Sequence, residues 1–200
     1  MQKFWNERYR EKEYAYGIAP NTFLKEYLAT ATPGSALFVA EGEGRNAVYA
    51  ASQAWQVSAF DSSEEAEKKA LQLADEKEQT ISYQVADALK VQYPKESFDL
   101  VVLIFAHFPS AVRQRIHQQL LSFLKPGGIL LLEAFHVSQL GNASGGPKDI
   151  DMLYTQEIIQ QDFNSLSIHT LEHCRVDLDE GPYHQGAAEV LRFIGKKINL

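Results

Sequence analysis

The sequence contains one cysteine, Cys174, among its 200 residues, so no disulfide can form within the chain. It has no apolar run of membrane-spanning length, and the longest, 129–135, is interrupted by Glu133. Basic residues number 19 against 26 acidic ones, and the net charge of −7 argues against nucleic acid as a partner. The first residues are polar and aromatic and lack the apolar core of a signal peptide. We therefore expect a cytoplasmic protein without membrane attachment.

A hydrophobic fraction of 45% and a charged fraction of 22% suit one globular domain with a substantial core. We expect an N-terminal helical cap at 1–33, a core of alternating strands and helices at 34–136, and a closing section at 137–200. In the cap, the apolar spacing over 23–28 indicates a helix that Asn21 or Thr22 begins.

The core section alternates short apolar runs with amphipathic stretches, which predicts a parallel sheet with right-handed crossovers. The runs at 98–105 and 129–135 are nearly unbroken, as in strands buried on both faces. Pro126 to Gly128 predicts a turn before the latter run. The expected strands are 37–40, 57–60, 81–86, 98–105 and 129–135, and the expected helices are 46–54, 64–78 and 110–124, with Ser62 or Ser63 opening the second helix.

The closing section differs from the core. Residues 155–163 read as a helix capped by Thr155, and 167–178 and 189–194 read as two strands joined by a turn at 179–182. An α/β fold follows: a Rossmann-like three-layer sandwich whose seven-stranded, mostly parallel sheet ends in an antiparallel C-terminal hairpin. A dinucleotide dehydrogenase would instead continue with a second mononucleotide-binding half.

One turn carries the strongest chemical signal. Residues 36–46 read Ala-Leu-Phe-Val-Ala-Glu-Gly-Glu-Gly-Arg-Asn, which is a strand, a tight turn and the start of a helix. Asp61 closes the next apolar run. This is the layout of a nucleotide site, in which glycines admit the ligand and an acid about 20 residues on accepts from the ribose hydroxyls. Taken alone, such a turn is also compatible with a plain strand-to-helix connection, although the nucleotide site is favoured.

The turn resembles motif I of class I S-adenosylmethionine-dependent methyltransferases, acid-x-Gly-x-Gly-x-Gly. Gly42 and Gly44 match it, whereas Phe38 stands where the acid often is and Ala40 replaces the first glycine. The variant is similar to that of small bacterial methyltransferases related to the tellurite-resistance and thiopurine methyltransferase types. Leu-Lys-Pro-Gly-Gly-Ile at 124–129 and the Glu-Gly-x-x-His-x-Gly pattern at 180–186 also resemble this family, so the resemblance covers nearly the whole chain.

The resemblance implies S-adenosyl-L-methionine as the cofactor and methylation of a small-molecule acceptor, whose identity stays open. It implies that Asp61 accepts hydrogen bonds from the ribose hydroxyls and that Asp87 accepts from the adenine amino group. The backbone amides of the turn, together with Glu41, would bind the methionine part of the cofactor. Glu41 takes over part of the role of the acid absent at Phe38. Arg45 either reaches the cofactor carboxylate or a substrate anion, or is a solvated surface charge. The expected cofactor-binding residues are Ala40, Glu41, Gly42, Gly44, Asp61, Ser62, Asp87, Ala88 and Phe105.

Four residues form the expected acceptor pocket: Trp5, Tyr16, His107 and His184. The two histidines are candidate general bases because imidazole titrates near neutrality. The alternatives are a packing role for His107 and a structural Glu–His pair at His184. Trp5 and Tyr16, with Tyr9 and Tyr14, are candidates for an aromatic lid over the cofactor, with 17–21 as its hinge.

A metal is not expected. His169, His173 and Cys174 are residue types that bind metal ions. On a strand, however, the two histidines face one side and the cysteine faces the other, so the three side chains cannot converge on one ion. Two alternative functions remain open: a nicotinamide-dependent oxidoreductase, and a non-catalytic module that binds S-adenosylmethionine. The sequence leaves the oligomeric state undetermined.

Overall fold

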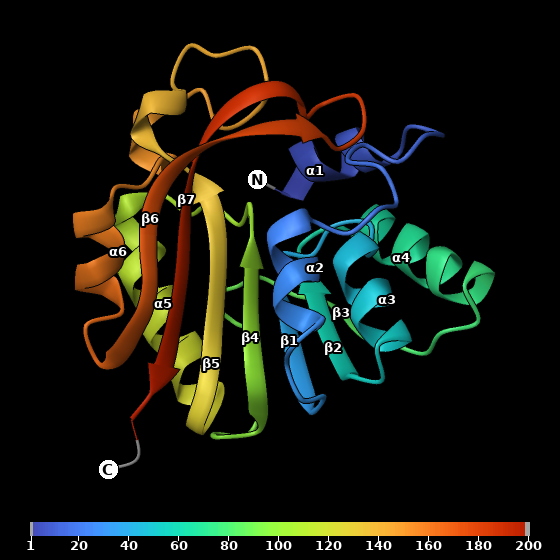
Figure 1. Ribbon diagram of the computed structural model, residues 1–200. Coiled ribbons are helices and arrows are strands. Elements are labelled where there is room, and N and C mark those ends of the chain that lie inside the picture. The colour runs from blue at the N-terminus through green and yellow to red at the C-terminus, as the bar shows by residue number, and fades with distance from the viewer. Residues whose placement is uncertain (1, 199–200) are drawn as a thin grey trace.

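The computed structural model describes residues 2–198. Its core is a seven-stranded sheet in the order β3-β2-β1-β4-β5-β7-β6, covered by helices (Figure 1). Strands β1 to β5 run parallel, and β7 runs antiparallel to both β5 and β6. The predicted fold class is therefore confirmed. The strands are β1 (Ser35–Val39), β2 (Gln56–Asp61), β3 (Ser82–Val85), β4 (Phe98–Ile104), β5 (Leu124–Phe135), β6 (Leu166–Asp179) and β7 (Gln185–Lys197).

Three helices, α2, α4 and α6, begin where capping residues predict. The side chains of Asn21, Ser63 and Thr155 each accept a hydrogen bond from a backbone amide three residues further on. These bonds satisfy amides that the first turn of a helix leaves free. The helices are α1 (Gln2–Tyr9), α2 (Thr22–Leu28), α3 (Arg45–Ser52), α4 (Glu64–Glu76), α5 (Ser110–Phe123) and α6 (Gln156–Asp162), with 3-10 turns at Val137–Gln139 and Ile150–Met152.

The core has two halves because successive side chains of a strand point to opposite faces. On β4, Val101 and Leu103 pack with the apolar residues of α5 and α6. Leu100 and Val102 pack on the other face with residues of α2, α3 and α4. Figure 1 shows these helix groups on opposite sides of the sheet. Burial on both faces explains the unbroken apolar runs.

Two predicted boundaries were wrong. The Pro126–Gly128 segment lies inside β5, which already pairs at Leu124 with Phe98; the ladder shifts register before it resumes at Leu100. A bulge-like irregularity thus absorbs the turn residues without ending the strand. The closing hairpin also turns later than expected, at 180–184, because Asp179 still pairs with Gln185. This change places His184 in the turn itself.

The N-terminal segment packs against the rest of the protein. Helix α1 and the chain that follows it cross the carboxyl ends of the parallel strands and pack against α4 (Figure 1). Across residues 2–198, every helix is too short or too polar to traverse a lipid bilayer.

Candidate cofactor and acceptor site

The order of the sheet reverses between β1 and β4, and ligands of open α/β sheets bind in the crevice outside such a switch point. The first residues after these two strands, Ala40 and Phe105, have φ values of 50° and 52°. Left-handed backbone at residues other than glycine costs about 1–3 kcal/mol each and concentrates at functional sites. Topology and strain therefore point to the same end of the sheet.

The glycine turn between β1 and α3 packs too tightly for side chains. Gly42 and Gly44 have φ values of 65° and 89°, which favour glycine. A Cβ atom on Gly44 would lie 2.7 Å from the Cβ of Ala70 on α4. A Cβ on Gly42 would lie 2.7 Å from the hydroxyl oxygen of Tyr9. The turn is thus enclosed by α4 on one side and by α1 on the other.

Glu41 organises this turn from within. Its Oε1 accepts hydrogen bonds from the backbone amides of Asn46, at 3.0 Å, and Ala47, at 2.7 Å. Burial raises the pKa of Glu41 to about 7, although these amide bonds act against the shift. Phe38, where the motif acid is absent, is buried in the core. Glu41 therefore caps α3, while its contact with a cofactor ammonium stays a prediction.

Asp61 ends β2 and joins it to the glycine turn. Its Oδ2 accepts from the Gly42 amide at 3.2 Å, and its Oδ1 accepts from the Ser63 amide at 2.9 Å; the adjacent Ser62 amide also contributes. The residue is only 5% exposed, and burial raises its pKa to about 6. Carboxylate oxygens have two lone-pair sites each, so capacity remains for ribose hydroxyls. That contact is still a prediction.

Asp87 and Ala88 follow β3 at the same edge of the sheet. The amide of Ala86 donates to the Asp61 carbonyl oxygen at 2.8 Å, which ties the two strand ends together. Asp87 is exposed, and its Oδ1 accepts from the Leu89 amide at 2.8 Å. The residue forms a turn, and its assignment to adenine remains untested.

A row of rings leads from the glycine turn to the acceptor side. Ring centroids are separated by 5.4 Å for Trp5 and Tyr9, and by 6.5 Å for Tyr9 and Tyr16. His184 continues the row, 4.5 Å from Tyr16 and 4.7 Å from Phe105. The structure thus brings the predicted residues Trp5, Tyr16, Phe105 and His184 together, with Tyr9 as the link.

His184 is held by a carboxylate. Its Nδ1 lies 3.2 Å from Oε2 of Glu180, and the histidine is 5% exposed. Burial opposes ionisation of Glu180, but bonds from His184 and Arg45 outweigh it and lower the pKa of Glu180 to about 2. Burial lowers the pKa of His184 despite the nearby carboxylate. A neutral His184 donates through Nδ1 and keeps Nε2 as an acceptor, with no hydrogen-bond partner among residues 2–198.

His107 differs from His184 in this respect. Its Nδ1 lies 2.6 Å from the Met152 carbonyl oxygen, and its Nε2 accepts from the Phe135 amide at 3.2 Å. Burial lowers its pKa to about 4. Both nitrogens are engaged by the backbone, so neither is available to take a proton from an acceptor. This arrangement favours the packing alternative for His107, and its general-base role stays a prediction.

Arg45 fits neither of its predicted roles. The side chain is buried, and it donates to the Ala19 carbonyl oxygen at 3.2 Å and to Oε2 of Glu180 at 2.8 Å. It therefore links the N-terminal segment to the hairpin turn. This role could not be predicted from the sequence, because Ala19 and Glu180 are distant from Arg45 along the chain.

Sequence reasoning also missed a buried polar network. Glu133 of β5 accepts from Nδ2 of Asn21 and from Nε of Arg192, each at 2.6 Å. Asn21 Nδ2 also lies 3.2 Å from Oε1 of Glu180, and its backbone amide donates to Oδ1 of Asn46 at 2.9 Å. The predicted hinge is thus anchored at its C-terminal end. The available signal was Glu133 itself, a carboxylate in an apolar strand that requires partners when buried.

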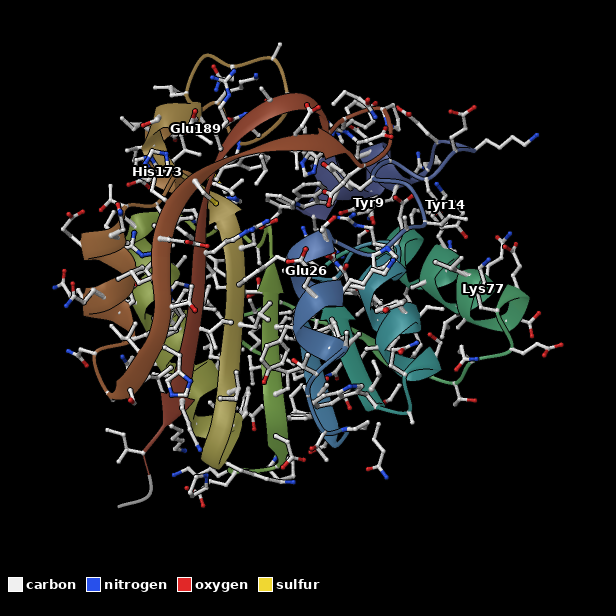
Figure 2. The ribbon with its side chains drawn as sticks, viewed as in Figure 1. Tyr9, Tyr14, Glu26, Lys77, His173 and Glu189 are labelled. Carbon is white, nitrogen blue, oxygen red and sulfur yellow. The ribbon has the colours of Figure 1, made fainter. Side chains whose placement is uncertain are left out.

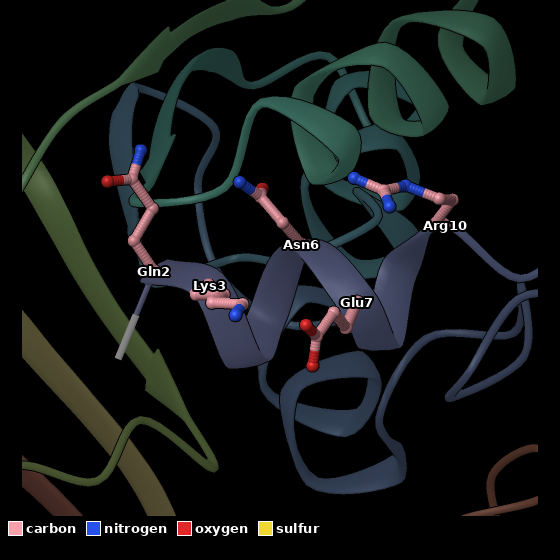
Figure 3. A pocket seen from close by; sticks show the side chains of 5 residues that line it. All are labelled: Gln2, Lys3, Asn6, Glu7 and Arg10. Atoms are coloured by element: carbon pink, nitrogen blue, oxygen red, sulfur yellow. The ribbon is translucent and has the colours of Figure 1, made fainter.

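The cavities lie outside this cradle. One of about 360 Å³ runs along the outer side of α1 (Figure 3), and another of about 240 Å³ lies beside α5. Neither is lined by a residue of the predicted cofactor or acceptor sets. The lining residues are Gln2, Lys3, Asn6, Glu7 and Arg10 for the first, and Val91, Gln92, Tyr93, Gln119 and Phe123 for the second.

The histidines of β6 have other partners. His173 Nε2 lies 2.8 Å from Oε2 of Glu189 on β7, and its ring stacks on His136 at 3.7 Å (Figure 2). Over residues 2–198, the structure contains no group of three or more His, Cys, Asp or Glu side chains able to hold a metal ion.

Residues 36–128 match a protein-family model described as a methyltransferase domain. The matched segment runs from β1 into β5 and contains the glycine turn, Asp61, Asp87 and Phe105. This family implies S-adenosylmethionine as the cofactor and supports a methyltransferase. A search of curated proteins found no match.

Solved structures share the fold at low identity. A protein studied for the conversion of a disulfide bond into a thioacetal group during echinomycin biosynthesis has a TM-score of 0.79 at 18% identity, over 99% of this chain and 92% of its own. TehB from Haemophilus influenzae has a TM-score of 0.74 at 13% identity, over 98% and 66%. The N-methyltransferase NodS from Bradyrhizobium japonicum has 0.71 at 15%, over 89% and 94%. At these identities the likeness concerns the fold alone.

Proposed function

We propose that this chain is an S-adenosylmethionine-dependent methyltransferase acting on a small-molecule acceptor. The observation that carries the proposal is the position of Asp61, whose carboxylate lies against the Gly42 amide at the switch point of the sheet. The sheet closes with the β6–β7 hairpin, which argues against the second half of a dinucleotide dehydrogenase. The family match over residues 36–128 supports the same function.

The residues of the cradle fit this cofactor chemically. The buried carboxylate of Asp61, the half-buried carboxylate of Glu41 and the amides of a glycine turn complement a ligand that carries hydroxyls, an ammonium group and a cationic sulfur. In the proposal, Glu41, Gly42 and Gly44 hold the methionine part and Asp61 the ribose, with Ser62 beside it. Asp87 and Ala88 contact the adenine. When bound, S-adenosylmethionine supplies an electrophilic methyl group.

The task of the protein is to align a nucleophile with that methyl group. Tyr16 and Phe105 flank His184 and exclude water from this part of the site. His184 Nε2 takes the proton of an oxygen or nitrogen nucleophile, while Glu180 holds the ring by its Nδ1. A thiolate requires no base, and in that case His184 only shapes the pocket.

Charge pairing favours an uncharged acceptor, such as a thiol or a phenol. Arg45 is paired with Glu180 at 2.8 Å and Arg192 with Glu133 at 2.6 Å. An oxyanion would have to compete with these buried carboxylates for its cation. Within the small bacterial type that the sequence resembles, we therefore favour a thiol acceptor, as in the thiopurine branch, over a chalcogen oxyanion.

Calorimetry with S-adenosylhomocysteine and NADH tests the cofactor, and a panel of thiols, phenols, amines and chalcogen oxyanions tests transfer from S-adenosylmethionine. We expect binding of S-adenosylhomocysteine and methylation of an uncharged thiol or phenol. Binding of NADH alone would indicate an oxidoreductase. Tight binding of S-adenosylhomocysteine without transfer to any member of the panel would indicate a non-catalytic module.

A further inference from the structure

Glu43 lies between the two glycines of the cradle, yet its side chain contacts the N-terminal segment. Its Oε2 accepts from the backbone amide of Ala15 at 2.7 Å, and the Tyr16 amide also bonds to this carboxylate. Its Oε1 accepts from Nζ of Lys69 on α4 at 2.7 Å. The side chains of Glu43 and Lys69 are 3% and 14% exposed, so the ion pair is largely shielded from solvent.

Lys69 holds the same segment from the other side. Its Nζ also donates to the Glu13 carbonyl oxygen at 2.7 Å and lies 5.1 Å from the ring centroid of Tyr14. The Tyr14 hydroxyl donates in turn to the Lys69 carbonyl oxygen at 3.3 Å. Residues 13–16 are therefore bound jointly by the cradle turn and by α4.

The segment bound in this way covers the cradle. Tyr9 precedes it, and its hydroxyl oxygen lies where a side chain on Gly42 would begin. Tyr16 ends it, and its ring contacts His184. Beyond this pair, a hydrogen bond of 2.6 Å from Ser63 Oγ to Asn6 Oδ1 is a further tie between α1 and the start of α4. Figure 2 shows Tyr9 and Tyr14 together at this end of the molecule.

We propose that Glu43 is a positioning residue whose ion pair with Lys69 latches residues 2–16 over the cradle, so that release of this latch controls cofactor entry and exit. The inference rests on the proposed function, because the cradle is taken as the cofactor site. A buried charge that loses its partner is strongly disfavoured, so removing either side chain weakens the closed state. Because Glu43 belongs to the turn that would hold the cofactor, ligand contacts and lid closure act on the same loop.

Limited proteolysis tests the latch without any ligand. Trypsin cleaves after Arg10 and Lys12, which are exposed in the turn after α1, and cleavage becomes faster when the adjoining segment 13–16 detaches. Lys69→Met removes the cation of the latch. Lys68→Met is the matched control, since Lys68 is an exposed neighbour on α4 that pairs with Glu65. We expect cleavage about tenfold faster in Lys69→Met than in the control, as for the loss of one charge-assisted hydrogen bond.

Stopped-flow binding of S-adenosylhomocysteine provides the second readout. Association and dissociation rate constants should both rise in Lys69→Met and Glu43→Ala. Glu43→Gln should fall between Glu43→Ala and the unmodified protein, because an amide oxygen still accepts from Ala15. Cleavage and exchange rates equal to those of Lys68→Met would overturn the latch. If the unmodified protein fails to bind S-adenosylhomocysteine, the proposed function fails, whereas the proteolysis result still judges the latch.

Discussion

The backbones of Gly17 and Gly181 cross in direct contact. A Cβ atom on Gly181 would lie 2.7 Å from the carbonyl carbon of Tyr16 and 2.8 Å from the carbonyl oxygen of Ala15. The crossing brings the N-terminal segment against the hairpin turn that carries Glu180 and His184. At Gly181 such a close approach is possible only without a side chain.

Gly181→Ala should separate these two chains. We expect it to lower the free energy of unfolding by about 1–3 kcal/mol more than Gly186→Ala, because the added methyl group overlaps backbone. Gly186 is the matched control: its φ of 92° is also left-handed, but a Cβ there would meet nothing within 4 Å. Urea denaturation of both variants gives the comparison. Equal losses would mean that backbone strain alone, and not the crossing, matters at Gly181.

Asp61→Ala should weaken binding of S-adenosylhomocysteine by about 2–3 kcal/mol, through the loss of charge-assisted hydrogen bonds. Isothermal titration calorimetry measures the effect, with Asp75→Ala on the exposed side of α4 as the control. Circular dichroism of both variants checks that the fold is retained. An affinity equal to that of the control would rule out the ribose assignment.

The stabilising contributions of Glu41 and Asp61 should fall as pH rises from about 5 to about 7. Burial raises the pKa of Glu41 from 4.5 to about 7 and that of Asp61 from 3.8 to about 6. At these two carboxylates the folded state binds more protons than the unfolded state in this window, so their contribution to stability decreases with increasing pH. The buried His107 and His184, whose pKa values are lowered, contribute in the opposite direction. Glu41→Gln keeps an acceptor for the α3 amides but no charge. The free energy of unfolding should therefore change between pH 5 and pH 7 without the loss of about 2 kcal/mol that Glu41 contributes.

Urea unfolding at several pH values measures this slope. The control is Glu26→Gln on the exposed side of α2, which should leave the slope unchanged (Figure 2). A slope in Glu41→Gln identical to that of the unmodified protein would show that the Glu41 carboxylate is not perturbed by burial.

Asp162→Asn should destabilise the packing of α6 on α5. Oδ2 of Asp162 accepts from Arg113 Nε at 2.7 Å and lies 2.8 Å from Nδ1 of His117, which is fully buried. Removing the carboxylate leaves a partly buried guanidinium without its anion, at a cost of about 3 kcal/mol. Urea denaturation at neutral pH tests this value against Asp179→Asn, an exposed position. A loss below that of the control would show that the ion pair contributes nothing to stability.

Local features of the site were predictable from the sequence. The strand ends at 39, 61 and 104 follow to within one residue from apolar runs. The caps at Asn21 and Ser63 follow from side-chain chemistry a few residues away. Both depend on neighbours within one turn or strand, which a sequence displays directly. The same holds for the closing hairpin, whose two strands are adjacent along the chain.

The partners of Arg45, Glu43 and His107 were not predictable in this way. Each of these side chains is committed to a carboxylate or to backbone groups of a segment remote in sequence, such as Ala19, Ala15 or Met152. A charged or titratable residue next to a glycine turn has many possible partners until the fold selects one. The pattern therefore located the site but could not distinguish a residue facing the ligand from one holding the lid.

The contacts of Asn21 impose an order on assembly of the protein. Its hydrogen bonds reach Asn46, Glu133 and Glu180, which are 25, 112 and 159 residues away. Contacts over such separations form late, because they require closure of nearly the whole chain. During synthesis, the N-terminal segment emerges first yet cannot reach its final position until the hairpin turn has been made. The parallel core can thus form before the site that it supports, and we expect the contacts of Asn21 to be among the last to form.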